Sequence, residues 1–434
     1  MIRLLLRALL RVYFRRVEVV GTEHVPAGGA AVFAPNHPNS LLDPLVLFAS
    51  VTRPVSTLAA EPLFRKPLLG WVMRSIGAIP VYRREDQADR SKNRETFRAA
   101  REHLAGGGAI AIFPEGVSHD DPSLRPIRTG AARIALGVNG AGPVQLVPTG
   151  LFYTARAHFR SDALVCFGEP IPVHGTALEG EPSPDAVQAV TSRLETAMGR
   201  LVLQTKERKE LRLVAAAERI FTTADVTPAD LQTVLRRRRR MVSRYAEWRE
   251  KDPDRVRVLE ARVRRYQRWL TATGLEHEHL PPGGFRPLQV ARMIGVVVPA
   301  LVLLTPLALV GIALHFPAWH LTRWLAHRRF TRSGRGEDVL GTMKLTVGLV
   351  TYPLTWMALA FAGWLIGGPI WGAAAAALGP LTGALALRFR MRWAQLTAAL
   401  RGLLLALFGT RLYRRMLAER RRLRAEFEAL ERSA

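Results

Sequence analysis

The sequence predicts an α/β domain with a mixed sheet, followed by a charged helical segment and a C-terminal helical membrane region. Three observations support this fold class. Short apolar runs alternate with amphipathic stretches early in the chain, charged residues dominate the middle, and two long stretches near the end contain no Asp, Glu, Lys or Arg. Alternating strand and helix patterns are typical of α/β domains, and long charge-free runs are typical of membrane helices.

Composition changes along the chain and divides it into five parts. A Pro-Pro-Gly-Gly turn at 281–284 marks the boundary before the membrane region. The five parts are an amphipathic interfacial helix at 1–16, an α/β domain at 17–206, a charged helical segment at 207–284, a membrane region at 285–409 and a charged helical tail at 410–434.

The N-terminal part predicts a helix that lies in a membrane interface. Arginines recur there every four residues, at Arg3, Arg7, Arg11 and Arg15, and apolar residues fill much of the remaining surface. Such a helix places its apolar side among lipid headgroups and its arginines toward anionic lipid. Because the arginines interrupt any continuous apolar core, a cleaved signal peptide is not expected.

The α/β domain is predicted from buried strands that each lead into a polar loop. The predicted strands are 30–34, 109–113 and 144–147, and the predicted helices are 92–104 and 129–136. Catalytic and binding groups in α/β domains stand at the ends of strands. We therefore look for the chemistry in the loops that follow these strands.

His37 and Asp43 follow the first of these strands. A neutral imidazole can take the proton of an attacking alcohol, while a nearby carboxylate fixes its tautomer and stabilises the imidazolium. This pair therefore suits acyl transfer to a hydroxyl. A His and an Asp in a turn-forming segment also occur without catalysis, so the assignment needs support from other motifs.

Further blocks supply that support. Together with the His-to-Asp segment at 36–44, the segments 77–83, 113–119 and 147–150 stand in an order and spacing that resemble the glycerophospholipid acyltransferase family. Members of that family move fatty acyl groups from coenzyme A or acyl carrier protein onto glycerol phosphates and lysophospholipids. The resemblance implies that His37 is the general base and that Asp43 is its orienting carboxylate.

The resemblance also implies a site for the phosphate of the acceptor. The family's binding arginine corresponds to Arg83, and its Glu-Gly loop corresponds to Glu115 and Gly116. A guanidinium matches a phosphate, and glycine lets the backbone approach it closely. Ser118, which stands where the family often has Thr-Arg, and Arg128 complete the predicted substrate-binding set. For the two arginines, a solvated surface charge is the alternative.

The spacing between His37 and Asp43 departs from the common family pattern. Five residues separate them here, whereas the family usually has four. His37 must therefore lie on a turn before a helix, with Ser40 or Asn39 near the N-cap. This spacing, together with residues 113–136, resembles the fungal glycerol 3-phosphate and dihydroxyacetone phosphate acyltransferases, which have a lysine in place of Arg128.

The net charge predicts an anionic partner. The chain has 62 Lys and Arg against 36 Asp and Glu, a formal charge of +26 and a pI near 11.4. Nucleic acid and acidic lipid both attract such a chain. The charge-free stretches at 293–322 and 345–387 favour lipid, since about 20 apolar residues can span a bilayer. We expect anionic membrane lipid as a partner and no nucleic acid.

The membrane region predicts a helical hairpin after a less regular segment. The stretch 345–387 is long enough for two crossings, with a break at 367–369, while Pro299 and Pro306 make the first stretch either one kinked span or a re-entrant pair of half-helices. Arginines flank both stretches. If positive flanks stay in the cytoplasm, a re-entrant segment is favoured and the catalytic domain lies on the cytoplasmic side.

The expected protein is a membrane-bound O-acyltransferase of phospholipid biosynthesis. It would move a fatty acyl group from acyl-CoA or acyl carrier protein, its only co-substrates, to the hydroxyl of glycerol 3-phosphate or 1-acylglycerol 3-phosphate. No cofactor is expected, and no metal, because the single Cys166 excludes cysteine-rich zinc sites. The alternatives are a non-catalytic basic protein that binds membrane surfaces or nucleic acid, and a transporter-like protein carrying an inert acyltransferase domain.

Overall fold

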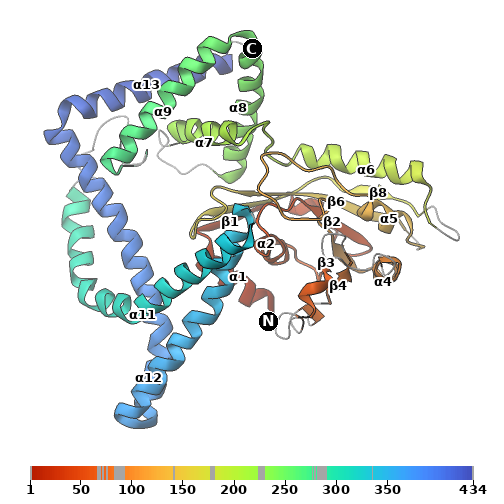
Figure 1. Ribbon diagram of the computed structural model, residues 1–434, viewed down its shortest axis with the longest axis horizontal. Helices are drawn as coiled ribbons and strands as arrows, with labels where there is room; N and C mark the ends of the chain where they lie inside the picture. The colour runs from red at the N-terminus through yellow and green to blue at the C-terminus, as the bar shows by residue number, and fades with distance from the viewer. Residues whose placement is uncertain are drawn as a thin grey trace. The chain divides into compact units, whose positions relative to one another are not determined.

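The computed structural model describes residues 2–65, 70, 73–74, 77–82, 93–139, 142–175, 181–222, 230–275, 277, 280, 291–334 and 336–432. The described chain forms two compact units (Figure 1). The first comprises Met1–Lys206 with Gly334–Thr342, and the second comprises Glu207–Ser333 with Met343–Ala434. The predicted boundary turn at 281–284 lies outside the described residues.

The first unit is built on a mixed sheet, as predicted. Its strands are β1 (Arg16–Val20), β2 (Ala31–Pro35), β3 (Ser56–Ala60), β4 (Ile79–Val81), β5 (Ala109–Ala111), β6 (Val144–Tyr153), β7 (Asp162–Phe167) and β8 (Ile171–Val173). They lie in the order β1-β7-β6-β2-β5-β3-β4, with β8 also paired to β6. Neighbouring strands are parallel except that β7 and β8 run antiparallel to β6.

The helices of the first unit agree with the amphipathic stretches of the sequence. They are α1 (Ile2–Tyr13), α2 (Leu42–Ser50), α4 (Asn93–Ala105), α5 (Gly130–Leu136) and α6 (Pro184–Gly199), with short 3-10 turns at Thr22–His24 and Glu61–Leu63. Local chemistry fixes their starts: at α6, the Ser183 hydroxyl accepts from Ala186 N–H, and Pro184 occupies the first turn, where its missing N–H costs no hydrogen bond. The predicted strands 30–34 and 109–113 and the predicted helices 92–104 and 129–136 are confirmed within two residues at each end. The predicted strand 144–147 begins where β6 begins, but β6 continues to Tyr153.

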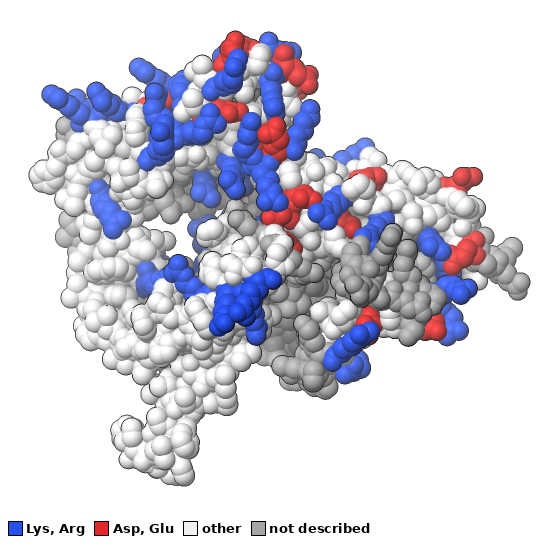
Figure 2. All heavy atoms as spheres, viewed as in Figure 1, with Lys and Arg blue, Asp and Glu red and all other residues white. Residues whose placement is uncertain are grey.

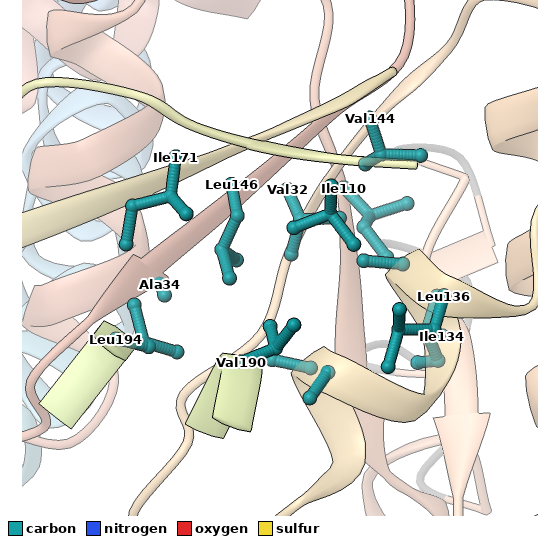
Figure 3. Close-up of a cluster of buried hydrophobic side chains, with 14 of the residues drawn as sticks. Val32, Ala34, Ile110, Ile134, Leu136, Val144, Leu146, Ile171, Val190 and Leu194 are labelled. Atoms are coloured by element: carbon teal, nitrogen blue, oxygen red, sulfur yellow. The ribbon is translucent and has the colours of Figure 1, made fainter. Parts of the chain in front are cut away.

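An apolar core fills the space between the sheet and α4, α5 and α6. Figure 3 shows side chains of β2, β5 and β6 facing side chains of α5 and α6. The labelled members are Val32, Ala34, Ile110, Ile134, Leu136, Val144, Leu146, Ile171, Val190 and Leu194. Truncation of such a fully buried Leu or Ile to Ala costs about 2–5 kcal/mol, so this core holds the strand ends in fixed positions.

Helix α1 contributes to the first unit as well as presenting an apolar surface. Leu10 and Tyr13 are 2% and 3% exposed, and Arg7 Nε donates to the carbonyl of Ala49 in α2 at 3.0 Å. Leu4 and Leu5, in contrast, are 70% and 64% exposed. One face of the helix therefore packs in the domain core, and another face exposes leucines.

Four charged helices pack together in the second unit. These are α7 (Arg208–Thr222), α8 (Leu231–Lys251), α9 (Pro253–Thr273) and α13 (Thr410–Arg432). Their shared core includes Val263 and Met416, and ion pairs such as Arg262 with Glu419, at 2.9 Å, join α9 to α13. The charges of the middle segment and of the tail thus pair with one another, although they are far apart in the sequence.

Two long apolar helices complete the second unit. A π-helical turn at Met293–Val297 leads into α11 (Val298–Ser333), which bends (Figure 1) and contains Pro306 and Pro317. Helix α12 (Leu340–Phe408) breaks at Gly367 and Gly368, whose φ values are −140° and +77°. The two helices are long and apolar enough to cross a membrane, and the visible tip of α12 shows no charged side chains (Figure 2).

The two arms of α12 fold back on each other, as the sequence predicts. A Cβ at Gly363 would lie 2.8 Å from the carbonyl oxygen of Trp371, and one at Gly379 would lie 3.1 Å from the Trp356 ring. Glycine therefore allows close packing of the antiparallel arms. The φ of +77° at Gly368, which an L side chain rarely adopts, makes the reversal possible.

Candidate active site

Three neighbouring parallel strands deliver the polar residues of the site to one edge of the sheet. His37 follows β2, Glu115 follows β5, and Tyr153 ends β6. Because β2 runs parallel to both β5 and β6, the ends of all three strands meet at this edge. Asn36 fixes the first of these ends, since its side-chain amide exchanges two hydrogen bonds with the backbone of Leu151 at 2.6 and 3.2 Å.

His37 and Asp43 form the pair that the sequence predicts. His37 Nδ1 lies 2.8 Å from Asp43 Oδ2, and its ring stacks on Phe113 with centroids 4.1 Å apart. The Asp43 side chain is fully buried, whereas that of His37 is 18% exposed. An ionised Asp43 only accepts, so Nδ1 carries the proton and Nε2 presents its lone pair. Among the described residues, no hydrogen-bond partner occupies Nε2.

Two further groups hold the Asp43 carboxylate. Tyr153 donates its hydroxyl to Oδ1 at 2.7 Å, and the backbone N–H of Asn39 donates to Oδ2 at 2.7 Å. With the His37 bond, the buried carboxylate accepts three hydrogen bonds, which compensate for the loss of water around its charge. The carboxylate is therefore fixed in position and can hold the imidazole in one orientation.

The turn between His37 and Asp43 explains how the longer spacing is accommodated. Ser40 adopts a φ of 48°, in the left-handed region, and α2 begins two residues later. Ser40 lies next to the N-cap residue, as predicted, but that residue is Leu41 and no side chain caps the helix. Instead, the left-handed residue absorbs the extra length of the turn, and Asp43 itself accepts the Asn39 N–H.

Glu115 and His119 form a second buried pair beside the first. Glu115 Oε1 accepts from His37 N–H at 3.0 Å, and its Oε2 lies against His119 Nε2. Since His119 Nδ1 accepts from Asp121 N–H at 3.2 Å, the proton of a neutral His119 resides on Nε2 and points at Glu115. Burial raises the pKa of Glu115 to about 7 and lowers the pKa of His119 to about 4.

Arg156 lines a small pocket together with Asn36, Pro38, Glu115 and His119. Its carbonyl oxygen accepts from Asn39 Nδ2 at 3.2 Å, but among the described residues no hydrogen-bonding or ion-pairing group contacts its guanidinium. Burial lowers the pKa of Arg156, while carboxylates in its surroundings, Asp43 first among them, raise it. A guanidinium without a direct partner beside a pocket is able to bind an anion.

The other predicted binding residues are placed as follows. A Cβ at Gly116 would lie 2.6 Å from Arg128 Nε, so the Arg128 side chain covers the backbone of Gly116, whose φ is +77°. Ser118 donates its hydroxyl to Asp338 at 2.5 Å. Arg83 lies outside the described residues. The structure thus brings the predicted residues His37, Asp43 and Glu115 together, and it places Arg128 against Gly116, the residue that follows Glu115.

Sequence reasoning missed Tyr153 and Arg156, although a signal was present. Both stand at or just beyond the end of β6, the strand that carries the fourth sequence block. Polar residues at the end of a parallel strand beside the His37 strand belong at the same sheet edge. For a metal, the described residues offer no group of three or more His, Cys, Asp or Glu side chains.

Two family models match the chain. The first, described as Acyltransferase, covers residues 16–151. The second, described as Glycerol-3-phosphate acyltransferase 2 C-terminal domain, covers residues 213–432, which is more than half of the 434 residues.

Individual proteins are similar to this chain over regions of different length. Glycerol-3-phosphate O-acyltransferase 2 of Saccharomyces cerevisiae is 31% identical over 288 residues, covering 62% of this chain and 38% of the yeast protein. Glycerol-3-phosphate O-acyltransferase 1 of the same organism is 25% identical over 457 residues, covering 81% and 59%. A chloroplastic 1-acyl-sn-glycerol-3-phosphate acyltransferase of Arabidopsis thaliana is 28% identical over 139 residues, covering 32% and 37%.

The chain therefore spans 38% and 59% of the lengths of these two yeast relatives. The acyltransferase match contains His37, Asp43 and Glu115, and the C-terminal match contains both apolar helices. The chain belongs to the acyltransferase family in which the glycerol-3-phosphate acyltransferase 2 C-terminal domain follows the acyltransferase domain.

Proposed function

We propose that this protein is a membrane-bound O-acyltransferase that acylates a glycerol phosphate acceptor, either glycerol 3-phosphate or 1-acylglycerol 3-phosphate. The acyl donor is a thioester of coenzyme A or acyl carrier protein. The observation that carries the proposal is the 2.8 Å contact between His37 Nδ1 and a buried Asp43 that three hydrogen bonds hold in place. The named functions of the yeast and plant relatives support the same chemistry.

The reaction uses His37 as a general base. Its Nε2 takes the proton of the acceptor hydroxyl while that oxygen attacks the thioester carbonyl carbon, and Asp43 stabilises the imidazolium that forms. The tetrahedral intermediate then collapses: the carbon–sulfur bond breaks and the leaving thiolate takes the proton back from His37. No acyl-enzyme is required, since the oxygen of the acceptor is itself the nucleophile.

Cations around the pocket bind the phosphate of the acceptor. Arg156 has no direct partner among the described residues and lines the pocket beside His119, so it is the first candidate. Arg128, whose side chain covers Gly116, is a second candidate, and Arg83, which lies outside the described residues, is a third candidate on the resemblance to the family alone. Binding at these cations holds the glycerol hydroxyl near His37, which lowers the entropy cost of the transfer.

The exposed apolar surfaces of α1, α11 and α12 support a membrane location. Leu303 of α11 and Ile366 of α12 are 81% and 87% exposed, which is costly in water and favourable in lipid. Arginines at the ends of the apolar stretches favour a cytoplasmic location for the catalytic domain. The acylated lipid product then partitions into the membrane that holds the enzyme.

The test is an acyl-transfer assay with the purified full-length chain in detergent. Acyl-CoA and acyl-acyl carrier protein are each offered glycerol 3-phosphate, dihydroxyacetone phosphate and 1-acylglycerol 3-phosphate. Glycerol and monoacylglycerol serve as matched acceptors without a phosphate. We expect a product with at least one phosphate-bearing acceptor and none with its matched control, whereas folded protein that acylates no acceptor would refute the proposed function.

A further inference from the structure

The segment between the two apolar helices belongs to the catalytic unit. Residues Gly336–Thr342, here called the linking segment, connect α11 to α12 and include a 3-10 turn and the first residues of α12. They pack with Met1–Lys206, although some 130 residues of the second unit separate them from that part in sequence. Asp338 and Val339 are both 3% exposed. The linking segment is therefore part of a packed interior.

Thr342 contacts residues 37–43, here called the catalytic turn, which begin with His37 and end with Asp43. Leu41 N–H donates to the Thr342 hydroxyl at 3.0 Å, and that hydroxyl donates to the carbonyl of Asn39 at 3.4 Å. Asn39 is the residue whose N–H holds Asp43 Oδ2. A single hydroxyl thus bridges two backbone groups on either side of Ser40.

The bridged turn needs such support. Ser40 has a φ of 48°, a conformation that is unfavourable for a residue with a Cβ and persists only where the surroundings enforce it. The helix that follows has no side-chain cap at Leu41, and the Leu41 N–H is satisfied by Thr342 instead. The local bond from Asn39 N–H to Asp43 leaves the Leu41 N–H unsatisfied, and the Thr342 hydroxyl accepts from it.

Two other residues of the linking segment approach the same site. Asp338 accepts from the Ser118 hydroxyl at 2.5 Å, on the loop that also carries Glu115. A Cβ at Gly341 would lie 2.9 Å from the Tyr13 hydroxyl, 3.0 Å from Leu42 Cδ1 and 3.1 Å from the Arg156 carbonyl oxygen. The segment therefore contacts both polar loops, and glycine permits its close approach.

We propose that the linking segment positions the catalytic turn, and that Thr342 is the positioning residue through which it does so. The inference rests on the proposed function and adds a role for a residue more than 300 positions away from Asn39. Through its hydrogen bonds, Thr342 holds Asn39 and Leu41 in place, and this keeps Asp43 at hydrogen-bonding distance from His37.

The experiment compares full-length variants in the acyl-transfer assay. Thr342→Val removes the hydroxyl and keeps the shape, Thr342→Ser keeps the hydroxyl, and Thr355→Val is a matched control whose hydroxyl bonds to its own helix. We expect Thr342→Val to lower kcat about tenfold with the acceptor KM unchanged within twofold, because small displacements of a base are costly. Thr342→Ser and Thr355→Val should retain kcat within about twofold of the wild type.

Hydrogen exchange of the same proteins supplies a readout that needs no turnover. In Thr342→Val, amides of the peptide 37–47 should exchange several-fold faster, while those of α4 keep the wild-type rate. Wild-type kcat together with wild-type exchange in Thr342→Val would overturn the inference, and so would an equal loss of kcat in Thr342→Ser. An inactive wild-type protein whose turn still loosens in Thr342→Val would refute the proposed function and leave the positioning contact intact.

Discussion

The catalytic turn and the apolar helices distribute polarity in opposite ways. Around His37 the buried side chains are polar: Asn39 and Asp43 are fully buried, and Glu115 is 3% exposed. In α11 and α12 the exposed side chains are apolar, with Leu303 at 81% and Ile370 at 81%. One region hides charges and amides from solvent, and the other presents hydrocarbon to it.

The difference shows that the two regions are adapted to different tasks. Buried polar groups are retained where their hydrogen bonds fix a geometry, as the three donors around Asp43 do. A long continuous surface of exposed apolar side chains, unlike a single one, is favourable only where the surroundings are apolar as well. In the proposed function the first region carries the chemistry and the second attaches the protein to lipid, and each part of the proposal can be tested separately.

The largest effect is expected from loss of the base. His37→Ala should lower kcat about 10³-fold, because no other group among those described stands in place to take the acceptor proton. The exposed His158 provides the matched control, and His158→Ala should keep wild-type turnover. Steady-state rates with saturating substrates measure both variants. Comparable rates in the two would remove His37 from the mechanism.

Glu115→Gln should change how stability depends on pH. With a pKa raised to about 7, Glu115 stabilises the fold fully below its ordinary value of 4.5, and this contribution is lost as pH rises to 7. His119, with its pKa lowered to about 4, acts in the opposite sense, so stability rises between pH 4 and 6.5. In the wild type, the contributions of Glu115 and His119 to the pH dependence of stability have opposite signs and largely cancel between pH 4.5 and 6.5.

The Glu115→Gln variant removes only the contribution of Glu115 to the pH dependence of the free energy of unfolding. The free energy of unfolding of Glu115→Gln relative to wild type should therefore increase by about 3 kcal/mol between pH 4.5 and 7, and any constant cost of the substitution cancels. Denaturant unfolding of both proteins across this range measures it. A difference that stays constant with pH would mean that Glu115 titrates normally.

A charge on the lipid-facing surface should weaken membrane attachment. Phe361 is 60% exposed in the first arm of α12, and Phe361→Asp adds a charge that costs about 3 kcal/mol near the centre of a span. Vesicle flotation should show the partition coefficient falling about 10²-fold. Val258→Asp, at a site 57% exposed on α9, should leave partition almost unchanged. Equal losses in the two variants would argue against a membrane role for α12.

A smaller effect is expected from Arg156→Ala. Loss of a charge-assisted hydrogen bond to the phosphate costs about 2 kcal/mol, so the acceptor KM should rise roughly 30-fold while the donor KM stays unchanged. Arg200→Ala, an exposed arginine of the same unit, is the control. Initial rates over a range of acceptor concentrations separate the two parameters. An unchanged acceptor KM in Arg156→Ala would exclude a phosphate contact there.

Local patterns predicted the parts of this molecule that depend on local sequence. The strands 30–34 and 109–113 could be placed because continuous apolar runs indicate buried strands, and the helices 92–104 and 129–136 because they are amphipathic. The α12 hairpin could be placed because Gly367 and Gly368 interrupt a uniform apolar run. The His37–Asp43 pair was identified because both residues lie in one turn.

Contacts between distant segments could not be predicted in the same way. In the linking segment, no feature of the sequence points from Asp338 to Ser118 or from Thr342 to Leu41, because tertiary packing alone brings them together. The left-handed conformation of Ser40 could not be predicted either, because serine usually favours a helix cap. The contact that supports this conformation comes from Thr342, which is distant in sequence. Tyr153 was missed because a tyrosine at the end of a strand is ordinarily a core residue.

The most direct test of the central claim, that Asp43 acts through His37, is the kcat of the double variant His37→Ala/Asp43→Asn beside the two single variants. Substitutions of residues that act as one unit have non-additive effects, so we expect the double variant to be no slower than His37→Ala alone. If the double variant were slower by the full factor that Asp43→Asn causes in the wild type, the two residues would act independently and the claim would be contradicted.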